Sequence, residues 1–487
     1  MPASTLAWTA VIAYALLTLG LAIRGALRTK SLEGFAVGNG DIHPALIGLS
    51  LTAQLTSVAT FVINPGLVFH SGVSGLLGYG VAAAAGITLG LIVFTARFRA
   101  VGAKVAALTV PSWIGARYEA PHLRALFTLL SLGLVAFAVL IVVALALVLS
   151  GLLGVAPVTL AVVLTAFVVG TLLIGGANGH ALTNAVQAMV MLVVAVVLIA
   201  AGLPLFTEGE GLLATLAAQD PQLLTVVNPS SLYFRNLFEV FVCNFLVGLA
   251  VVCQPHIVGK ALYLREDRQV RTFLSVAVVA GMVFLGVLLV GLYARTAVPL
   301  DTRIDLVVPT WIGATFSGPM QVLISIGMLC AGMSTLEGIL LALSGIFALD
   351  LHPLLGGKDP KAALRFGKAG LVVVALVTVA LAARQIADPV GGSVAIFAQY
   401  GVYLLFTASF LPLACGMFLP TVGRGAVTFA SLAAIAGYLG ASVFELTMLS
   451  SNPAFLATIG IGCGWTVVGV ALAVQKRAPQ PAAAAQA

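Results

Sequence analysis

Apolar runs of about 20 residues recur along the whole chain, and they restrict its fold more than any other feature of the sequence. A helix of that length rises about 30 Å, which matches the hydrocarbon core of a bilayer. Since 61% of the residues are hydrophobic and only 8% are charged, these runs are too many to be the core helices of a water-soluble protein. The sequence therefore predicts an all-α polytopic membrane protein.

We expect about thirteen transmembrane helices. The first run has no basic residue before it and no cleavage site after it, so we expect a retained helix rather than a signal peptide. The predicted spans are Leu6 to Ile23, Ala45 to Phe69, Gly75 to Ala96, Ala125 to Gly151, Pro157 to Ile174, Ala181 to Leu203, Leu237 to Leu262, Thr272 to Tyr293, Met320 to Leu349, Ala369 to Ala383, Val394 to Phe418, Val427 to Leu446 and Phe455 to Val474.

The Lys and Arg residues give this topology a direction. With the N-terminus outside and the C-terminus inside, nineteen of the 23 fall on the inner side, and the remaining ones are Arg235, Arg295, Arg303 and Arg384. Cytoplasmic loops of membrane proteins are enriched in these residues. The distribution explains the net charge of +7 without a nucleic-acid partner. We expect a protein integral to the cytoplasmic (inner) membrane of a bacterium.

The residue pattern gives no indication of an enzyme. We find no nucleophile–base pair, metal-ligand cluster or phosphate-binding loop. The 5 Cys residues all lie in apolar segments, where we expect them to pack rather than to form disulfides or bind a metal.

Two spans contain sequences that interrupt an apolar helix. The second contains Asn-Pro-Gly at 64–66, and the seventh contains Cys-Gln-Pro-His-Ile-Val-Gly at 253–259. Each opens a unit of five spans, and the two units start on opposite sides of the membrane, which is the layout of inverted repeats. The predicted regions are an extra helix with an inner loop (1–44), the first repeat (45–203), an outer loop (204–236), the second repeat (237–420), and two C-terminal helices with a disordered tail (421–487).

Polar residues in the second and ninth spans form a candidate cation site. An interruption within the stretch QLTSVATFVINPG would free backbone carbonyls, which Ala53 and Thr56 could present. In the ninth span, Ala331, Ser334 and Thr335 are spaced i, i+3, i+4 and place two hydroxyls on one helix face. Such oxygens suit sodium, which needs few formal charges around it. The alternative interpretation is that both hydroxyls only bond back to their own helix.

Six stretches of the chain resemble the sodium:solute symporter family and follow the family's order. They are SLEGFAVGNGDIHP, LTAQLTSVATFVINPGLVFHSG, GGANGHALTNAVQAMVM, CQPHIVGKALYL, AGMSTLEGILLALSGIFALD and PLACGMFLPTVGRGA. The resemblance implies a LeuT-type core of 5+5 inverted repeats, with one helix before it and two after it. It also implies one sodium ion, held by the residues that local chemistry selects: Ala53, Thr56, Ala331, Ser334 and Thr335.

Two positions depart from the family pattern. Many members have a carboxylate where this chain has Leu55, and an Asp where it has Asn184. An Asn can coordinate through its amide oxygen but carries no charge, so we do not expect a second sodium site there.

Glu337 is the unusual intramembrane acid, and it could compensate for the missing carboxylates or admit protons. The alternative is a structural carboxyl, paired with an inner cation or protonated within the bundle. Glu239 and Glu445 lie nearer the outer ends of their spans, and we expect them to be solvated.

In the family that the chain resembles, substrate lies beside the broken first and sixth core helices, near the third and tenth. The resemblance gives eight candidate substrate-binding residues: Gln54, Ser57, Asn64, Asn244, Gln254, Gln399, Tyr400 and Tyr403. We interpret His256 as a structural histidine at a helix break rather than a proton relay. No Trp or Tyr precedes Pro255 closely, unlike in the proline carriers, so we expect a small carboxylate or another small polar nutrient.

The sequence therefore predicts a secondary active transporter that imports this nutrient by sodium symport and alternating access, acting as a monomer in the lipid bilayer. Besides a sodium-insensitive exchanger of the same fold, two alternatives stay open. One is a proton-coupled carrier of the same fold that uses Glu337. The other, of a different class, is a membrane substrate sensor whose transport is vestigial.

Overall fold

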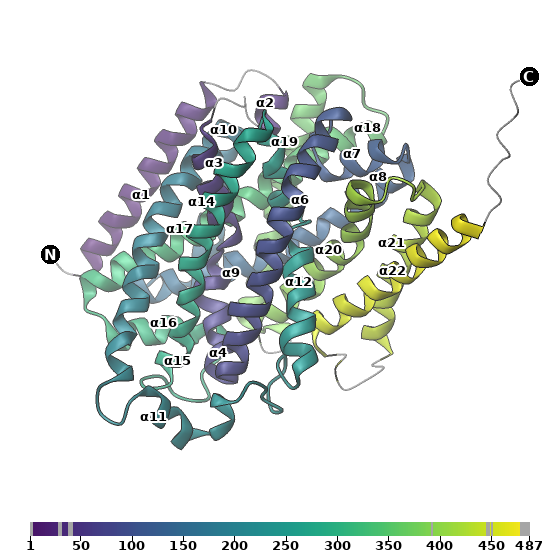
Figure 1. Ribbon diagram of the computed structural model, residues 1–487. Coiled ribbons are helices and arrows are strands. Elements are labelled where there is room, and N and C mark those ends of the chain that lie inside the picture. The colour runs from purple at the N-terminus through teal and green to yellow at the C-terminus, as the bar shows by residue number, and fades with distance from the viewer. Residues whose placement is uncertain are drawn as a thin grey trace, which may run out of the picture.

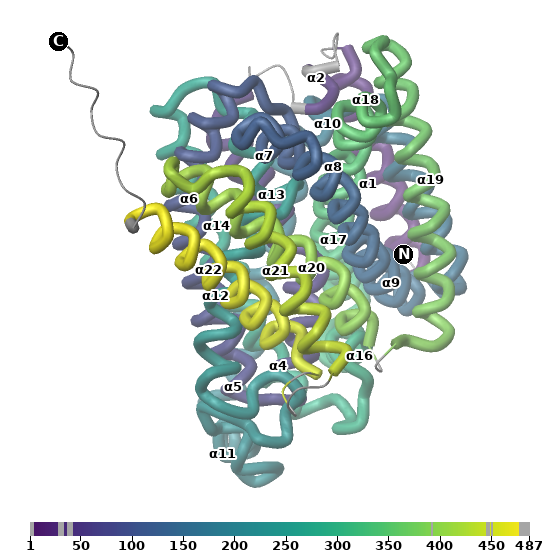
Figure 2. Tube along the Cα trace, turned by 90° about the vertical axis from the view of Figure 1, so that its right-hand side faces the viewer, coloured from purple at the N-terminus to yellow at the C-terminus, as the bar shows by residue number. Residues whose placement is uncertain are grey.

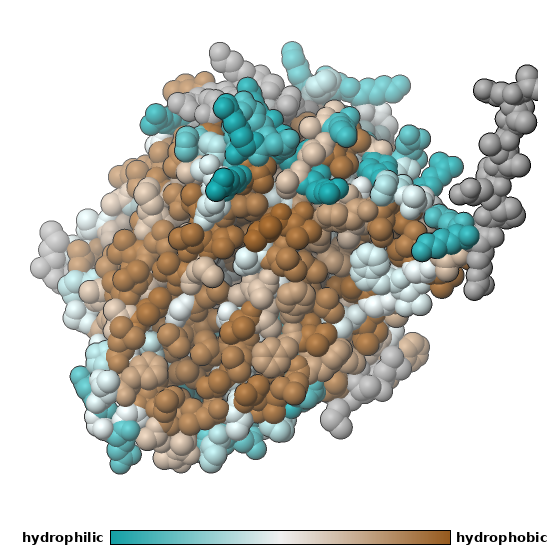
Figure 3. All heavy atoms as spheres, in the orientation of Figure 1, coloured by the Kyte–Doolittle hydropathy of each residue, from teal (hydrophilic) through white to brown (hydrophobic). Residues whose placement is uncertain are grey.

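The computed structural model describes residues 3–27, 32–37, 42–390, 393–444, 449 and 451–477, so the predicted tail from residue 478 and Glu445 lie outside these ranges. Within them the chain is helical and forms no β-strand, which confirms the all-α prediction. Long helices run between the two ends of the molecule (Figures 1 and 2). An apolar band separates two hydrophilic ends on the face shown in Figure 3, as a membrane-spanning bundle requires.

The first half of the chain carries ten helices in the described ranges: α1 (Ala3–Ala26), α2 (Leu32–Val37), α3 (Pro44–Leu55), α4 (Asn64–Ser71), α5 (Val73–Gly75), α6 (Ala84–Lys104), α7 (Val110–Arg117), α8 (Pro121–Leu130), α9 (Leu134–Leu153) and α10 (Pro157–Gly202). The rest of the described chain carries α11 (Leu212–Gln219), α12 (Asn244–Val251), α13 (Pro255–Val258), α14 (Asp267–Leu285), α15 (Val290–Ala294), α16 (Ile304–Thr315), α17 (Gly318–Ile346), α18 (His352–Leu354), α19 (Pro360–Ala387), α20 (Val394–Phe418), α21 (Arg424–Val443) and α22 (Pro453–Arg477).

These helices limit the number of membrane crossings but do not determine it. In the described part of the chain, 10 helical segments are long and apolar enough to cross a bilayer, and each of 2 further bent pairs could form one span. Thirteen crossings stays a prediction, and it requires α10 to cross twice.

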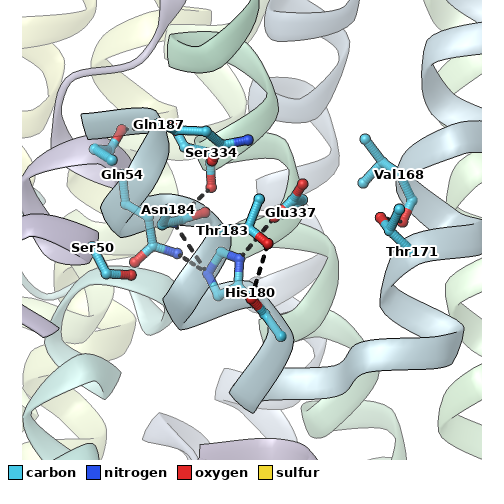
Figure 4. A network of polar contacts seen from close by, with 12 residues as sticks. Ser50, Gln54, Val168, Thr171, His180, Thr183, Asn184, Gln187, Ser334 and Glu337 are labelled. Atoms are coloured by element: carbon cyan, nitrogen blue, oxygen red, sulfur yellow. Dashed lines mark hydrogen bonds and ion pairs between the residues drawn. The ribbon is translucent and has the colours of Figure 1, made fainter. Parts of the chain in front are cut away.

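The helix α10 reverses direction at Gly176. This glycine has φ 53° and ψ −154° inside a helix of 46 residues, and the combination of angles is accessible almost only to glycine. A straight helix of that length would be about 70 Å long, far more than a bilayer is thick. The reversal places the segment that starts near His180 beside α17, on a ribbon separate from Val168 and Thr171 (Figure 4).

The first interrupted span bends earlier than the sequence indicates. The segments Pro44–Leu55 and Ala59–Ser71 meet at 51°, whereas Asn64 and Pro65 begin α4 in direct continuation of a π-helical turn, Ala59–Ile63. The prediction of a break at Asn64–Gly66 is therefore wrong. Pro65 has no backbone N–H to donate, and it lies directly after the π-helical turn, where the hydrogen-bonding pattern of the segment changes.

The second interrupted span bends where the sequence predicts. The segments Phe238–Val251 and Pro255–Tyr263 meet at 53°, and Pro255 opens the helix after the bend. Proline favours this position because it has no backbone N–H and its φ is fixed near the helical value.

Both bends face α17, which lies in the centre of the bundle. Its residues from Gly327 to Leu341 are all buried, and the helix packs against α3, α9, α10 and α13. Polar groups on this stretch can be stable only if other helices supply partners.

Candidate functional site

Two hydroxyl groups of α17 connect it to the broken end of α3. Ser334 Oγ donates to the Ala53 carbonyl oxygen at 2.9 Å. Thr335 Oγ1 lies 3.4 Å from the same oxygen and 3.1 Å from the Gln54 carbonyl oxygen. The Ala331 carbonyl oxygen lies 3.0 Å from Ser334 Oγ and 3.2 Å from Thr335 Oγ1. Each hydroxyl thus bonds back to its own helix and also reaches α3.

Four of the five predicted sodium residues therefore gather in one cluster, which we call the oxygen cluster: Ala53, Ala331, Ser334 and Thr335. Thr56 is the residue at which α3 ends, and its backbone N–H donates to the Thr52 carbonyl at 2.8 Å. Its side chain is buried and lines a separate cavity of about 170 Å³ beside α14. The hydrogen bonds of the oxygen cluster do not include Thr56.

The chemistry of the oxygen cluster suits a monovalent cation as a transported substrate. Since α3 ends at Leu55, the carbonyls of its last turn lose the partners that a continuing helix would provide. Unwound carbonyls of this kind coordinate sodium in transporters with broken helices. All four groups are buried, and their oxygens carry no formal charge. The cluster therefore has no negative charge to balance the charge of one bound sodium ion.

A central cavity of about 170 Å³ lies on the other side of the same bend. Seven of the eight predicted substrate residues line it: Gln54, Ser57, Asn64, Asn244, Gln254, Gln399 and Tyr403. Its lining contains no charged side chain. Gln254 Oε1 is buried without a hydrogen-bond partner, so this amide can still accept from a bound molecule. The cavity thus offers amides and hydroxyls to a polar ligand.

Tyr400 is the predicted residue that does not line the central cavity. Its carbonyl accepts a hydrogen bond from the Tyr438 hydroxyl of α21 at 3.2 Å, and it lies one turn before Tyr403 on α20. The sequence analysis in turn missed Tyr79 and Phe137, which do line the cavity. The signal for Tyr79 was a tyrosine between glycines in an apolar run, Leu-Gly-Tyr-Gly-Val.

A buried histidine, His180, was also missed and joins the two predicted coupling residues (Figure 4). His180 Nδ1 lies 3.2 Å from Glu337 Oε2, and both side chains are almost fully buried. Glu337 thus pairs with a histidine of α10 rather than with a basic residue of the inner loops. The signal in the sequence was a histidine within an unusually polar intramembrane stretch, Gly-Ala-Asn-Gly-His.

The neighbouring amides assign the tautomer of His180. The amide nitrogens of Gln54 and Asn184 lie 3.0 and 3.4 Å from His180 Nε2. Asn184 Nδ2 also donates to the Ser334 carbonyl at 3.3 Å, which fixes the orientation of that amide. With the amide nitrogens of Gln54 and Asn184 facing the ring, as here, Nε2 acts as the acceptor for one of them and Nδ1 carries the proton toward Glu337.

These contacts form one continuous network. Asn184 links His180 to Ser334 of the oxygen cluster, while Gln54 links it to the central cavity. The oxygens Gln54 Oε1, Asn184 Oδ1 and Glu337 Oε1 have no hydrogen-bond partner although they are buried. Buried acceptors without partners are costly and uncommon, and they concentrate where a protein binds ions or moves protons.

The prediction that Glu239 is solvated is wrong. Its carboxylate is fully buried and accepts from the guanidinium of Arg235 at 2.6 Å and from Asn452 Nδ2 at 2.9 Å. The physical reason is that the segment before α22 folds over the outer end of the seventh span and supplies Asn452.

Comparison with known proteins places this geometry among transporters. A profile described as the sodium:solute symporter family matches residues 35–429. The sodium/pantothenate symporter of Haemophilus influenzae is 27% identical over 334 residues, which are 67% of each chain. The sodium/pantothenate symporter of Escherichia coli is 24% identical over 366 residues, or 70% of this chain and 71% of the relative.

Solved structures share the fold at lower identity. A substrate-bound, outward-open sodium-coupled sialic acid symporter superposes with a TM-score of 0.78 at 17% identity, over 96% of this chain and 98% of the other. A nucleobase-cation-symport-1 family transporter in a closed conformation superposes with a TM-score of 0.56 at 17% identity, over 92% and 95% of the two chains. These neighbours are LeuT-fold transporters.

Proposed function

Since this chain belongs to the sodium:solute symporter family, we propose that it imports a small carboxylate nutrient together with one sodium ion, and that pantothenate is the first substrate to test. The family and its named relatives are transporters rather than enzymes, and many apolar helices make this an integral inner-membrane protein. The substrate, the number of ions, the inward direction and the monomeric state belong to the proposal.

The proposal rests on one observation: residues of a single bend belong to both the oxygen cluster and the central cavity. The last turn of α3 gives its carbonyl oxygens to the oxygen cluster, and the side chains of Gln54 and Ser57 at the same bend line the central cavity. An ion that fixes this turn therefore also fixes part of the substrate site. Coupling then follows because each ligand favours the conformation that the other binds.

The central cavity has groups for the different parts of pantothenate. Its amides and hydroxyls can bond the amide and the hydroxyls of the substrate, and Tyr79 and Phe137 can cover the apolar carbons. The helical segment that begins at Ala59 places the positive end of its dipole at the bend, which favours a carboxylate there, although the N–H groups of Ala59 and Thr60 already donate to Ser57. A sodium ion at the oxygen cluster would add a positive charge nearby.

The energy of one sodium ion is sufficient for accumulation. A charge that moves inward through 100 mV releases about 2.3 kcal/mol, and a tenfold concentration gradient adds about 1.4 kcal/mol. In the proposed cycle sodium binds first, connects α3 to α17 and completes the substrate site, after which the bundle closes outside and opens inside. The excess of Lys and Arg at one end supports an outer N-terminus and an inner C-terminus.

The test is uptake of labelled pantothenate into proteoliposomes with an imposed sodium gradient, beside acetate, pyruvate, proline and sialic acid. We expect sodium-driven accumulation that is lost in the double variant Ser334→Ala with Thr335→Ala. The matched control is Ser344→Ala, which removes another buried hydroxyl of α17, one that bonds the Gly367 carbonyl instead. If the control lost sodium-driven uptake equally, the oxygen cluster could no longer be assigned as the sodium site. Uptake that does not require sodium would overturn the proposed sodium coupling.

Proton coupling is the second candidate, and the buried contact between His180 and Glu337 favours it. A proton could be carried on either partner without leaving the network. Accumulation that is driven by a proton gradient alone and is abolished by Glu337→Gln would replace sodium with the proton as the coupling ion.

A further inference from the structure

A second, smaller cavity is lined by residues of α2, α3, α10, α13 and α17 and by the start of α7. Figure 2 shows α2 and α7 at one end of the bundle. The volume of the cavity is about 50 Å³, space for a few water-sized groups and too little for a whole nutrient molecule. Three of its lining side chains are basic: His180, His256 and Lys260. Among the described residues, no carboxylate lines it. We call it the lysine cavity.

Lys260 is buried in this cavity without an ion pair among the described residues. Its side chain is 2% exposed. Nζ donates to Ser50 Oγ at 2.8 Å and lies 4.8 Å from the centre of the Tyr263 ring. An ammonium group has three N–H donors, and neither contact neutralises its charge. A buried ammonium in this state is unfavourable unless it loses its proton or an anion joins it.

His256 gives an independent indication of a ligand. It is 4% exposed, and neither ring nitrogen has a hydrogen-bond partner. A neutral imidazole has one N–H donor and one acceptor, so an available donor lines the same cavity as Lys260. The sequence-based interpretation of a structural histidine does not account for a ring that bonds nothing.

The buried acid closest to these groups in the network is Glu337, which does not line the lysine cavity and has His180 as its hydrogen-bond partner. Glu337 therefore acts on Lys260 only at longer range. Lys260 and His256 thus each bring N–H donors to a cavity that no described carboxylate lines.

The lysine cavity shares lining residues with two other cavities, one on each side. Gln54 lines both it and the central cavity. On its other side, Leu108 lines both it and a cavity of about 390 Å³ that contains Arg99, at the basic end of the bundle. The three spaces follow one another from the centre to the end that the distribution of Lys and Arg assigns to the cytoplasm.

We propose that the lysine cavity binds the carboxylate group of the substrate after it leaves the central cavity and before it is released inside. Lys260 supplies the charge and one donor, and His256 supplies a second donor. The remainder of the molecule still occupies the central cavity at this stage, with Gln54 between the two parts. This proposal rests on a carboxylate as the substrate class, and it makes Lys260 a specificity-determining residue.

The test uses acetate as the minimal carboxylate, with the purified full-length protein in detergent and binding measured by calorimetry. We expect acetate binding in the wild type, a loss of about tenfold or more in affinity in Lys260→Gln, and retention in Lys260→Arg, which keeps the charge. The control is Lys368→Gln, because Lys368 also bonds one neutral oxygen, the Leu173 carbonyl, and lies over an aromatic ring. If Lys260→Gln does not fold, His256→Phe tests the second donor.

Two results would overturn the proposal. One is equal acetate affinity in the wild type and Lys260→Gln. The other is Lys260-dependent binding of inorganic phosphate or chloride in preference to acetate, which would assign the cavity to an inorganic anion.

Transport gives a second readout and separates the two proposals. From loaded proteoliposomes, Lys260→Gln should slow the efflux of pantothenate by about tenfold and that of its alcohol analogue pantothenol by less than about twofold. Equal slowing of both would overturn the role of the carboxylate. If the wild type transports neither compound, the proposed substrate fails, whereas acetate binding that depends on Lys260 would still stand.

Discussion

The Ser334 hydroxyl of α17 donates a hydrogen bond of 2.9 Å to the Ala53 carbonyl oxygen, which belongs to the last turn of α3. This contact joins the middle of α17 to the bend that follows α3. It also brings both oxygens close enough to bind the same cation, so we expect the hydroxyls of α17 to determine how tightly the proposed sodium ion is held.

Thr335 provides a sharp test of the oxygen cluster. Thr335→Val keeps the shape of the side chain and removes its hydroxyl, whereas Thr335→Ser keeps the hydroxyl. We expect the sodium concentration for half-maximal uptake to rise about tenfold in the valine variant and to change by less than about twofold in the serine variant. The measurement is uptake as a function of sodium concentration. Similar half-maximal sodium concentrations for both variants would show that Thr335 contributes only packing.

Gly338 leaves room for Gln54. A Cβ atom at Gly338 would lie 1.7 Å from Gln54 Nε2, so Gly338→Ala must displace the end of this side chain and break its bond to His180. The expected result is a loss of about tenfold in substrate affinity with little change in thermal stability, because a flexible side chain can move.

Gln54→Ala removes the clash, and the double variant with Gly338→Ala should be no worse than Gln54→Ala alone. Additive losses in this cycle would contradict a role of Gly338 through Gln54.

Two tyrosines of α20 differ in their relation to the central cavity. Tyr403 lines it, whereas Tyr400 does not. We expect Tyr403→Phe to weaken substrate binding by about three- to tenfold, the value of about one hydrogen bond, and Tyr400→Phe to leave it unchanged. Half-saturation constants for uptake are the measurement, and the reverse order would mean that another state of the protein exposes Tyr400 to substrate.

The tautomer of His180 predicts a direction for pH dependence. When His180 is protonated, Nε2 can no longer accept from Gln54 and Asn184, and a new positive charge faces Lys260 and His256. Glu337 on α17 is the acid that faces it. Sodium-driven uptake should therefore fall once the pH is low enough to protonate His180, and this fall should be smaller in His180→Gln. Faster uptake at acidic pH would favour proton coupling instead.

Glu239 is expected to contribute to stability rather than to transport. Removing the charge in Glu239→Gln leaves the guanidinium of Arg235 without its buried partner, and such a loss costs about 3 to 5 kcal/mol. Asp388→Asn is the control, since the Arg384–Asp388 pair is mostly exposed and contributes at most about 1 kcal/mol. Thermal unfolding in detergent should separate the two variants clearly, and equal shifts would refute the difference.

Patterns local in the sequence predicted most of the fold. The apolar run predicted the span Val394 to Phe418, and α20 has the same first and last residues. Pro255 marked the second bend. The i, i+3, i+4 spacing of Ala331, Ser334 and Thr335 selected a helix face that does meet α3. Each of these features depends on neighbours within one helix.

Features that depend on contacts between distant segments could not be predicted from local sequence patterns. The exact position of the bend within the polar stretch could not be predicted, because no Pro or Gly marks Thr56–Val58 and the carbonyls before it find their partners on α17. The pairing of Glu337 with His180, and that of Glu239 with Asn452, join residues on different helices. Whether Tyr400 or Tyr403 faces the cavity depends on the rotation of α20 about its axis, which a uniformly apolar helix does not reveal.

The two bends have different physical origins. The one at Pro255 is built into the covalent chain, since proline lacks the N–H that a continuous helix would need. The one at Thr56–Val58 contains neither Pro nor Gly; it is held by the Ser57 hydroxyl, which accepts from the Ala59 N–H, and by the hydroxyls of α17. Each such bond contributes about 1 kcal/mol, comparable to the differential binding energy of a ligand. The two bends thus differ in stiffness: the bend at Pro255 is permanent, whereas the bend at Thr56–Val58 can be changed by any group that competes for a few hydrogen bonds.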